Sequence, residues 1–110
     1  MRVHGVIGDV EGKDVIFFDD EIITGDSIID GARAVRDQGA EKIYAGCVHG
    51  TLAAGAIERI EASDLEGLAI TDTVPIGEES EKINICSVAE LFAKAIKAIH
   101  QETSISALFE

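Results

Sequence analysis

Apolar runs alternate with amphipathic segments along this chain, and this alternation predicts its secondary structure. Five runs have the length of strands: residues 3–7, 15–18, 43–48, 68–71 and 82–86. The run at residues 15–18 is apolar at every position. Such a run is typical of a strand that is covered on both faces, as strands of a parallel sheet are.

Three segments repeat apolar residues at helical spacing and predict helices. Two of them span residues 27–38 and 52–62, and the third is a last helix that Ser87 is expected to cap. Ser27 and Ser87 each have an acidic residue three positions later, which is the spacing of a capping box. We expect the apolar stripe of the last helix to lie in the core and the tail at 104–109 to dock. That stripe consists of Leu91, Ala95, Ile96 and Ile99.

Strands followed by helices predict an α/β fold, with a mostly parallel sheet flanked by helices and right-handed crossovers. Ligands of such sheets bind beyond the carboxyl ends of the strands. The segments to consider for function are therefore residues 19–27, 49–51 and 72–77, together with the start of the last helix.

Length and composition favour one small domain over residues 1–110. Hydrophobic residues make up 46% of the chain but aromatic ones only 5%, so we expect a core of aliphatic side chains. Cys47 and Cys86 are too few for a disulfide framework, and we interpret both as buried free thiols of a reduced, cytoplasmic protein. The sequence has neither a membrane-spanning apolar stretch nor the apolar core of a signal peptide.

The formal net charge of −12 narrows the class of partner. It argues against sequence-independent binding of nucleic acid and against binding to an anionic membrane surface, because both require Lys and Arg. It leaves a small anionic ligand open, because backbone N–H groups at the start of a helix hold a phosphate without help from cationic side chains.

Residues 19–27 connect a predicted buried strand to a helix, and their polar groups suit a sugar phosphate. Asp19 and Asp20 emerge at the strand end, where carboxylates accept hydrogen bonds from a sugar diol. Free N–H groups and the hydroxyls of Thr24 and Ser27 follow at the helix start, where they suit a phosphate. A purely structural interpretation is also open, in which the aspartates are solvated and Ser27 only caps the helix.

Residues 15–27 also resemble a known motif. The sequence VIFFDDEIITGDS is similar to the phosphoribosyl-diphosphate-binding motif of type I phosphoribosyltransferases, which has four apolar residues, two acidic ones, two or three apolar ones and then Thr-Gly-x-Ser/Thr. Segments at 6–13, 71–75, 87–91 and 104–109 resemble ribose-phosphate diphosphokinase, and so do the residues at 49–50 and 56–59. The resemblance covers nearly the whole chain and implies a phosphoribosyltransferase-like domain.

The resemblance also implies an activity and its site. The diphosphokinases move the β,γ-diphosphate of ATP to O1 of ribose 5-phosphate, with Mg²⁺, in nucleotide biosynthesis. Asp19 and Asp20 would face the ribose hydroxyls and help to place Mg²⁺. The 5-phosphate would be held by Thr24, Gly25, Asp26 and Ser27. Ser104 and Ser106 resemble the part that meets a regulatory phosphate at a subunit boundary, which implies a homo-oligomer.

The chain departs from the family pattern in two ways. The position of Asp26 is often Gly, and a carboxylate repels a phosphate unless it points away or is offset by a cation. We expect its side chain to face solvent or cap the helix. The resemblance also covers only the carboxyl-terminal part of the enzyme, without the ATP half or the catalytic Lys and Arg loop. We therefore assign no catalytic residue and predict that the chain alone binds the sugar phosphate without efficient turnover.

Two other interpretations of function remain open. One is a non-catalytic regulatory or binding paralogue that keeps the sugar-phosphate loop. The other is a receiver domain, for which Asp72 could be the phospho-acceptor but no Lys fills the second required position. His49 and Asp72 also follow predicted strands, and each is interpreted as a structural or turn residue or as a supporting residue of the site.

Overall fold

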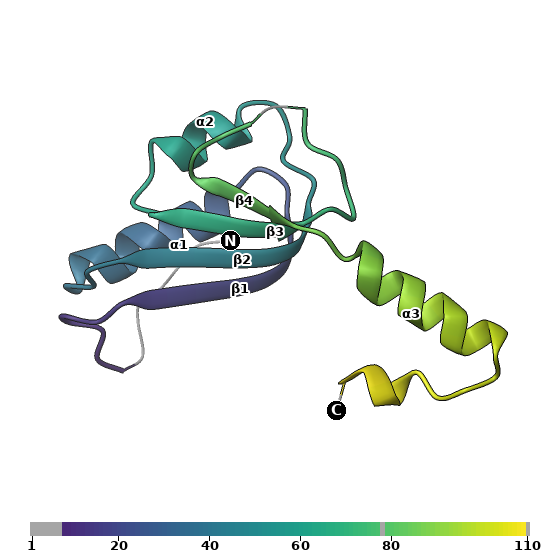
Figure 1. Cartoon of the computed structure of the whole chain (residues 1–110). Helices are drawn as coiled ribbons and strands as arrows, with labels where there is room; N and C mark the ends of the chain where they lie inside the picture. The colour runs from purple at the N-terminus through teal and green to yellow at the C-terminus, as the bar shows by residue number, and fades with distance from the viewer. Residues whose placement is uncertain (1–7, 78, 110) are drawn as a thin grey trace.

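The computed structural model describes residues 8–77 and 79–109, and it confirms the α/β fold. Four parallel strands lie side by side in chain order: β1 (Val15–Ile22), β2 (Ile43–Gly50), β3 (Gly67–Thr71) and β4 (Ile83–Cys86). They alternate with α1 (Asp26–Asp37) and α2 (Ala56–Glu61), and then come α3 (Ala89–His100) and a 3₁₀ helix, η1 (Ser106–Phe109) (Figure 1). The strand predicted at residues 3–7 lies outside the described residues.

An aliphatic core lies between the sheet and the two helices α1 and α2. On α1, Ile28, Ala32 and Val35 recur at helical spacing and are buried. The largest fully buried side chains of the core are Ile43, Ile60, Leu65, Leu68 and Ile70. The prediction of an aliphatic core is therefore confirmed, and this core holds the ends of β1 and α1 that form the site.

The opposite face of the sheet is bare in the described residues. Each strand is added on the same side of the one before it, so that right-handed crossovers place α1 and α2 on the same face. The other face presents Ile16 and Tyr44, which pair across β1 and β2, and Phe18, whose side chain is 83% exposed. The prediction that residues 15–18 are covered on both faces is therefore wrong for this part of the chain.

Helix α3 projects away from the sheet (Figure 1). Its apolar stripe was expected in the core, but Leu91, Ile96 and Ile99 are exposed, because neither the sheet nor α1 or α2 lies against them. The tail docks on α3 itself, where η1 lies. The resulting shape is elongated, since the radius of gyration is 16.6 Å, against about 13 Å for a compact chain of this length.

The predicted helix caps differ from the observed ones. Val88 is the N-cap of α3, but Ser87 still serves its start, because the Ser87 hydroxyl accepts from Ala89 N–H at 3.2 Å. Asp72 adds to it: Oδ1 accepts from Val88 N–H at 2.8 Å and Oδ2 accepts from the Ser87 hydroxyl at 2.7 Å. Helix α1 has Gly25 as its N-cap, without a capping side chain. Ser27 lies inside the helix and does not cap it, because the N-cap is Gly25, with a positive φ, two residues before the predicted cap.

The predicted helix over residues 52–62 forms only at Ala56–Glu61. The residues before it bind the β1–α1 connection: Leu52 N–H donates to Ile22 O at 3.1 Å and Ala53 N–H donates to Ile23 O at 2.7 Å. Leu52 also has a φ of 37°, which is incompatible with a helix. These hydrogen bonds tie the end of β2 to the end of β1. No helix in the described ranges is long and apolar enough to cross a bilayer.

Candidate functional site

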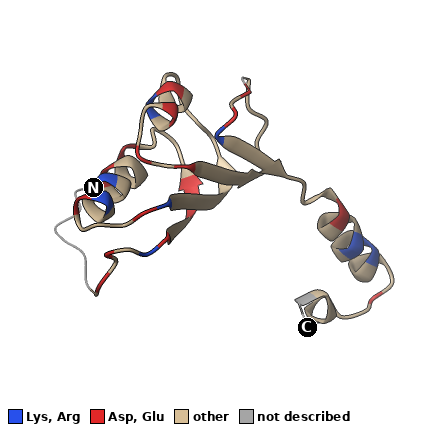
Figure 2. Ribbon diagram, turned by 60° about the vertical axis from the view of Figure 1, so that its left-hand side comes forward, with Lys and Arg blue, Asp and Glu red and all other residues tan. Residues whose placement is uncertain are grey.

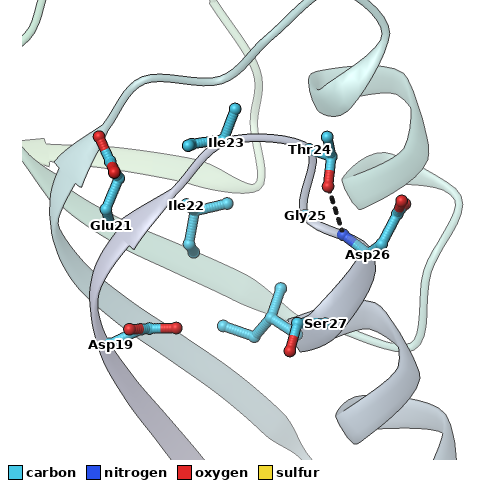
Figure 3. Close-up of a pocket in the computed structure, with 9 residues that line it drawn as sticks. Asp19, Glu21, Ile22, Ile23, Thr24, Gly25, Asp26 and Ser27 are labelled. Atoms are coloured by element: carbon cyan, nitrogen blue, oxygen red, sulfur yellow. Dashed lines mark hydrogen bonds between the residues drawn. The ribbon is translucent and has the colours of Figure 1, made fainter. Parts of the chain in front are cut away.

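A pocket of about 170 Å³ lies at the carboxyl end of β1 and continues to the first turn of α1 (Figure 3). It is smaller than the roughly 300–1,000 Å³ of pockets for drug-sized ligands, and so it suits a small group. Its lining consists of Asp19, Glu21, Ile22, Ile23, Thr24, Gly25, Asp26, Ser27 and Ile28. The pocket therefore contains every residue predicted for the site between 19 and 27 except Asp20.

Asp20 is separated from Asp19 by the pleat of the strand. Residues 19–22 were expected to form a loop, but β1 extends to Ile22, and successive side chains of a strand point to opposite faces. The Asp19 carboxylate points toward the start of α1, whereas the Glu21 side chain leaves the other side of the strand and points away from Asp19 (Figure 3). Hydrogen bonds, first with the Asp19 side chain and then with the backbone of Glu21, hold the pKa of Asp20 below its usual value.

Glu21 is a site residue that sequence reasoning missed. Its Oε2 accepts a hydrogen bond from the Thr51 hydroxyl at 2.9 Å, across the β1–β2 pair. Both residues border the pocket, but only the Asp19 carboxylate points toward the start of α1 (Figure 3).

The start of α1 forms the other end of the pocket. Gly25 precedes the helix with φ 84°, a conformation that favours glycine. Ile29 N–H makes the first helical hydrogen bond, to Gly25 O at 2.9 Å, and Asp26 N–H donates to Thr24 Oγ1 at 3.3 Å. The N–H groups of Ser27 and Ile28 are left without an acceptor among the described residues, as first-turn groups of a helix are.

The Asp26 carboxylate points away from Asp19 and Ser27 (Figure 3). It is 69% exposed, and its Oδ1 lies 3.5 Å from Nε of Arg59 on α2. This agrees with the expectation that the side chain faces solvent. Arg59 was not predicted for the site, because nothing in the spacing of the sequence brings residue 59 next to residue 26.

Comparison with known proteins identifies the family. The model of the phosphoribosyl synthetase-associated domain matches residues 3–110. The chain belongs to this family. Its phosphoribosyl synthetase domain is 47% identical over 110 residues to a ribose-phosphate pyrophosphokinase of Caldanaerobacter subterraneus subsp. tengcongensis, covering 98% of this chain and 35% of that protein. A ribose-phosphate pyrophosphokinase of Synechococcus elongatus is 44% identical over 111 residues, with 98% and 34% covered.

A solved structure agrees with this assignment. The crystal structure of phosphoribosylpyrophosphate synthetase from Mycobacterium smegmatis matches the phosphoribosyl synthetase domain with a TM-score of 0.87 and 32% identity. The match covers 89% of this chain and 34% of that one. The resemblance to ribose-phosphate diphosphokinase, which is the same enzyme as the pyrophosphokinase, is thus confirmed. The chain spans about a third of the length of these relatives.

The phosphoribosyl synthetase domain has hard oxygen donors in the pocket, and these suit Mg²⁺. Mg²⁺ is usually bound through one or two carboxylates together with substrate phosphates and water, without a full protein cage. Asp19 supplies such a carboxylate. A group of three or more His, Cys, Asp or Glu side chains that could hold a metal by itself does not occur among the described residues.

The other residues considered from the sequence lie outside the pocket lining. His49 Nδ1 lies 2.8 Å from the Thr73 hydroxyl, and Asp72 is occupied at the start of α3. Ser104 and Ser106 are hydrogen bonded to each other at 2.6 Å, in the tail beyond α3. These contacts account for His49 and Asp72 structurally.

The two cysteines of the domain differ in exposure. Cys47 is buried on β2 and free, as expected, and its pKa is raised, first by burial and then by the charge of Asp19. Cys86 is free but exposed, so its predicted burial is wrong. It is the last residue of β4, at the edge of the sheet, where no further strand covers it.

Proposed function

We propose that this phosphoribosyl synthetase domain binds the ribose 5-phosphate group of phosphoribosyl ligands in the pocket between β1 and α1. The observation that carries the proposal is the composition of that one pocket. It joins the Asp19 carboxylate at a strand end to the unpaired N–H groups of a helix start, within a chain that belongs to the phosphoribosyl synthetase-associated family. These two ends suit a diol and a phosphate respectively.

The phosphate belongs at the start of α1 in this proposal. The N–H groups of Ser27 and Ile28 donate to its oxygens, together with the hydroxyls of Thr24 and Ser27. The dipole of a twelve-residue helix adds attraction at this end. Gly25 supplies the φ of 84° from which the helix begins, a conformation that favours glycine.

The ribose hydroxyls belong at the strand end, where the Asp19 carboxylate accepts their hydrogen bonds. Asp20 was expected to share this role but does not line the pocket, and Glu21 borders the pocket while its carboxylate accepts from Thr51. Asp19 would also help to hold Mg²⁺, which would neutralise the negative charge of a bound diphosphate.

The names of the longer relatives indicate the reaction to which this site would contribute. We infer that the domain supplies the ribose 5-phosphate site of a ribose-phosphate pyrophosphokinase. Transfer of the diphosphate from ATP then depends on the part of such proteins that this chain does not span, and the 110 residues alone bind without efficient turnover.

Calorimetric titration with ribose 5-phosphate, with and without Mg²⁺, tests the proposal. Asp19→Asn should weaken binding roughly 10- to 100-fold, because a charge-assisted hydrogen bond contributes roughly 1.5–3 kcal/mol. Asp37→Asn is the matched control, since Asp37 is an acidic residue at the opposite end of α1. Absence of binding at millimolar ligand, or equal affinity in the Asp19→Asn and Asp37→Asn variants, would rule the site out.

A further inference from the structure

Arg59 is the cation that contacts the β1–α1 connection from another element. Its Nη2 donates to Thr24 O at 2.8 Å, and its Nε lies 3.5 Å from Asp26 Oδ1. One guanidinium thus joins two residues of the pocket, across 35 positions of sequence from Thr24. A planar fork serves both acceptors at once, which the single ammonium of a lysine does poorly.

The local backbone makes room for this guanidinium. A Cβ built at Gly55 would lie 2.9 Å from Arg59 Nη1, so a side chain at position 55 would displace the arginine. The Arg59 side chain thereby returns to the amino end of α2. A positive charge is unfavourable at that end of a helix, so stabilisation of α2 does not explain the position of the guanidinium. Its hydrogen bond and its ion pair both go to the pocket residues.

The surroundings explain why a cation is needed there. The chain carries a formal net charge of −12, with 21 Asp and Glu against 9 Lys and Arg, and Figure 2 marks where the acidic and basic residues lie along the ribbon. Asp26 adds a carboxylate beside the helix start, where the proposed phosphate monoester carries roughly −1.5 to −2 charges at pH 7. Two like charges at such a distance repel each other unless a cation offsets one of them.

We propose that Arg59 is a positioning residue for the phosphate, which neutralises Asp26 and holds its carboxylate and the Thr24 carbonyl turned away from the pocket. This inference rests on the proposed function of the pocket. The Arg59 and Asp26 side chains are 43% and 69% exposed, so their attraction contributes little to stability. The effect of Arg59 therefore falls on phosphate affinity and much less on folding.

A double-mutant cycle on ribose 5-phosphate affinity tests this role. Arg59→Gln removes the charge, and we expect it to weaken binding about 10-fold, the order expected for a partly exposed charge acting near a dianion. Asp26→Asn should bind as tightly as the unmodified chain or more tightly. In the Asp26→Asn background, Arg59→Gln should cost less than about 3-fold, because the repulsion that Arg59 offsets is then absent.

Arg33→Gln is the matched control, since Arg33 lines the neighbouring groove between α1 and α2 and its loss changes the net charge equally. It should leave the affinity within about 2-fold, as expected for a charge screened by solvent. An equal loss from Arg59→Gln in both backgrounds, or no larger loss than from Arg33→Gln, would overturn the role of Arg59 alone. An unmodified chain that fails to bind ribose 5-phosphate would instead overturn the proposed function, and this inference with it.

Discussion

Substitution of Gly50 by alanine should destabilise the chain at the edge of the site. Gly50 is buried at the end of β2, where it pairs with Ile22 of β1. A Cβ at this position would lie 2.7 Å from Cδ1 of Ile70 and 3.1 Å from its Cγ2. Because Ile70 is itself fully buried, it has little room to move.

The magnitude follows from two opposing effects. Overpacking of a filled core costs about 1–3 kcal/mol. Replacement of a strand glycine by alanine returns about 0.5–1 kcal/mol of conformational entropy. We therefore expect Gly50→Ala to lower the free energy of unfolding, by up to about 2.5 kcal/mol.

Gly46→Ala on the same strand is the matched control. Its Cβ would meet the Phe18 ring at 3.4 Å on the bare face, which is ordinary contact with a side chain that can move. It should raise the free energy of unfolding by about 0.5–1 kcal/mol. Urea unfolding followed by circular dichroism measures both variants. If Gly50→Ala were as stable as Gly46→Ala, the packing of Ile70 against the end of β2 would be refuted.

Three further predictions concern α3, the cysteines and the bare face. The hydrogen bonds from Val88 and Ser87 lower the pKa of Asp72 below its ordinary 3.8, so the ionised carboxylate stabilises α3 fully above pH 3.8 and this stabilisation is lost as the pH falls through the lowered pKa. When the pH is lowered through this region, the helical ellipticity of the unmodified chain should fall more than that of Asp72→Asn, and identical titration curves would contradict the cap. Exposed Cys86 should react with a thiol reagent in the folded chain, whereas buried Cys47, with its raised pKa, should react only on unfolding; equal rates would contradict this difference. The bare sheet face and the exposed stripe of α3 predict self-association, which light scattering should show at micromolar concentration and which Phe18→Ser with Ile96→Ser should reduce; a monomer in both forms would refute it.

The strands and the first helix could be predicted from the sequence because local pattern determines them. The apolar run at 15–18 and the recurrence of Ile28, Ala32 and Val35 carry the periods of a strand and of a helix. The end of β1 could not be predicted in this way. The polar residues 19–21 look like a loop, and they continue the strand because β2 pairs with them through His49.

Tertiary contacts account for the parts of the site that the sequence did not reveal. The extension of β1 leaves Asp20 outside the pocket lining and lets Glu21 reach the Thr51 hydroxyl that follows β2. Arg59 reaches the site through the packing of α2, which no local signal encodes. The prediction that α3 packs on the core was wrong for a related reason. An amphipathic pattern indicates that a helix has an apolar face but does not indicate which part of the protein covers that face.

Titration of the ¹⁵N-labelled chain with ribose 5-phosphate, followed by amide chemical shifts, tests the central claim most directly. Binding at the pocket predicts saturable shifts that are largest at Ser27 and Ile28, with further shifts at Asp19 and Glu21. It also predicts little change in α3, which lies away from the pocket. Shifts that are absent at millimolar ligand, or that gather on residues away from the β1–α1 connection, would contradict the account.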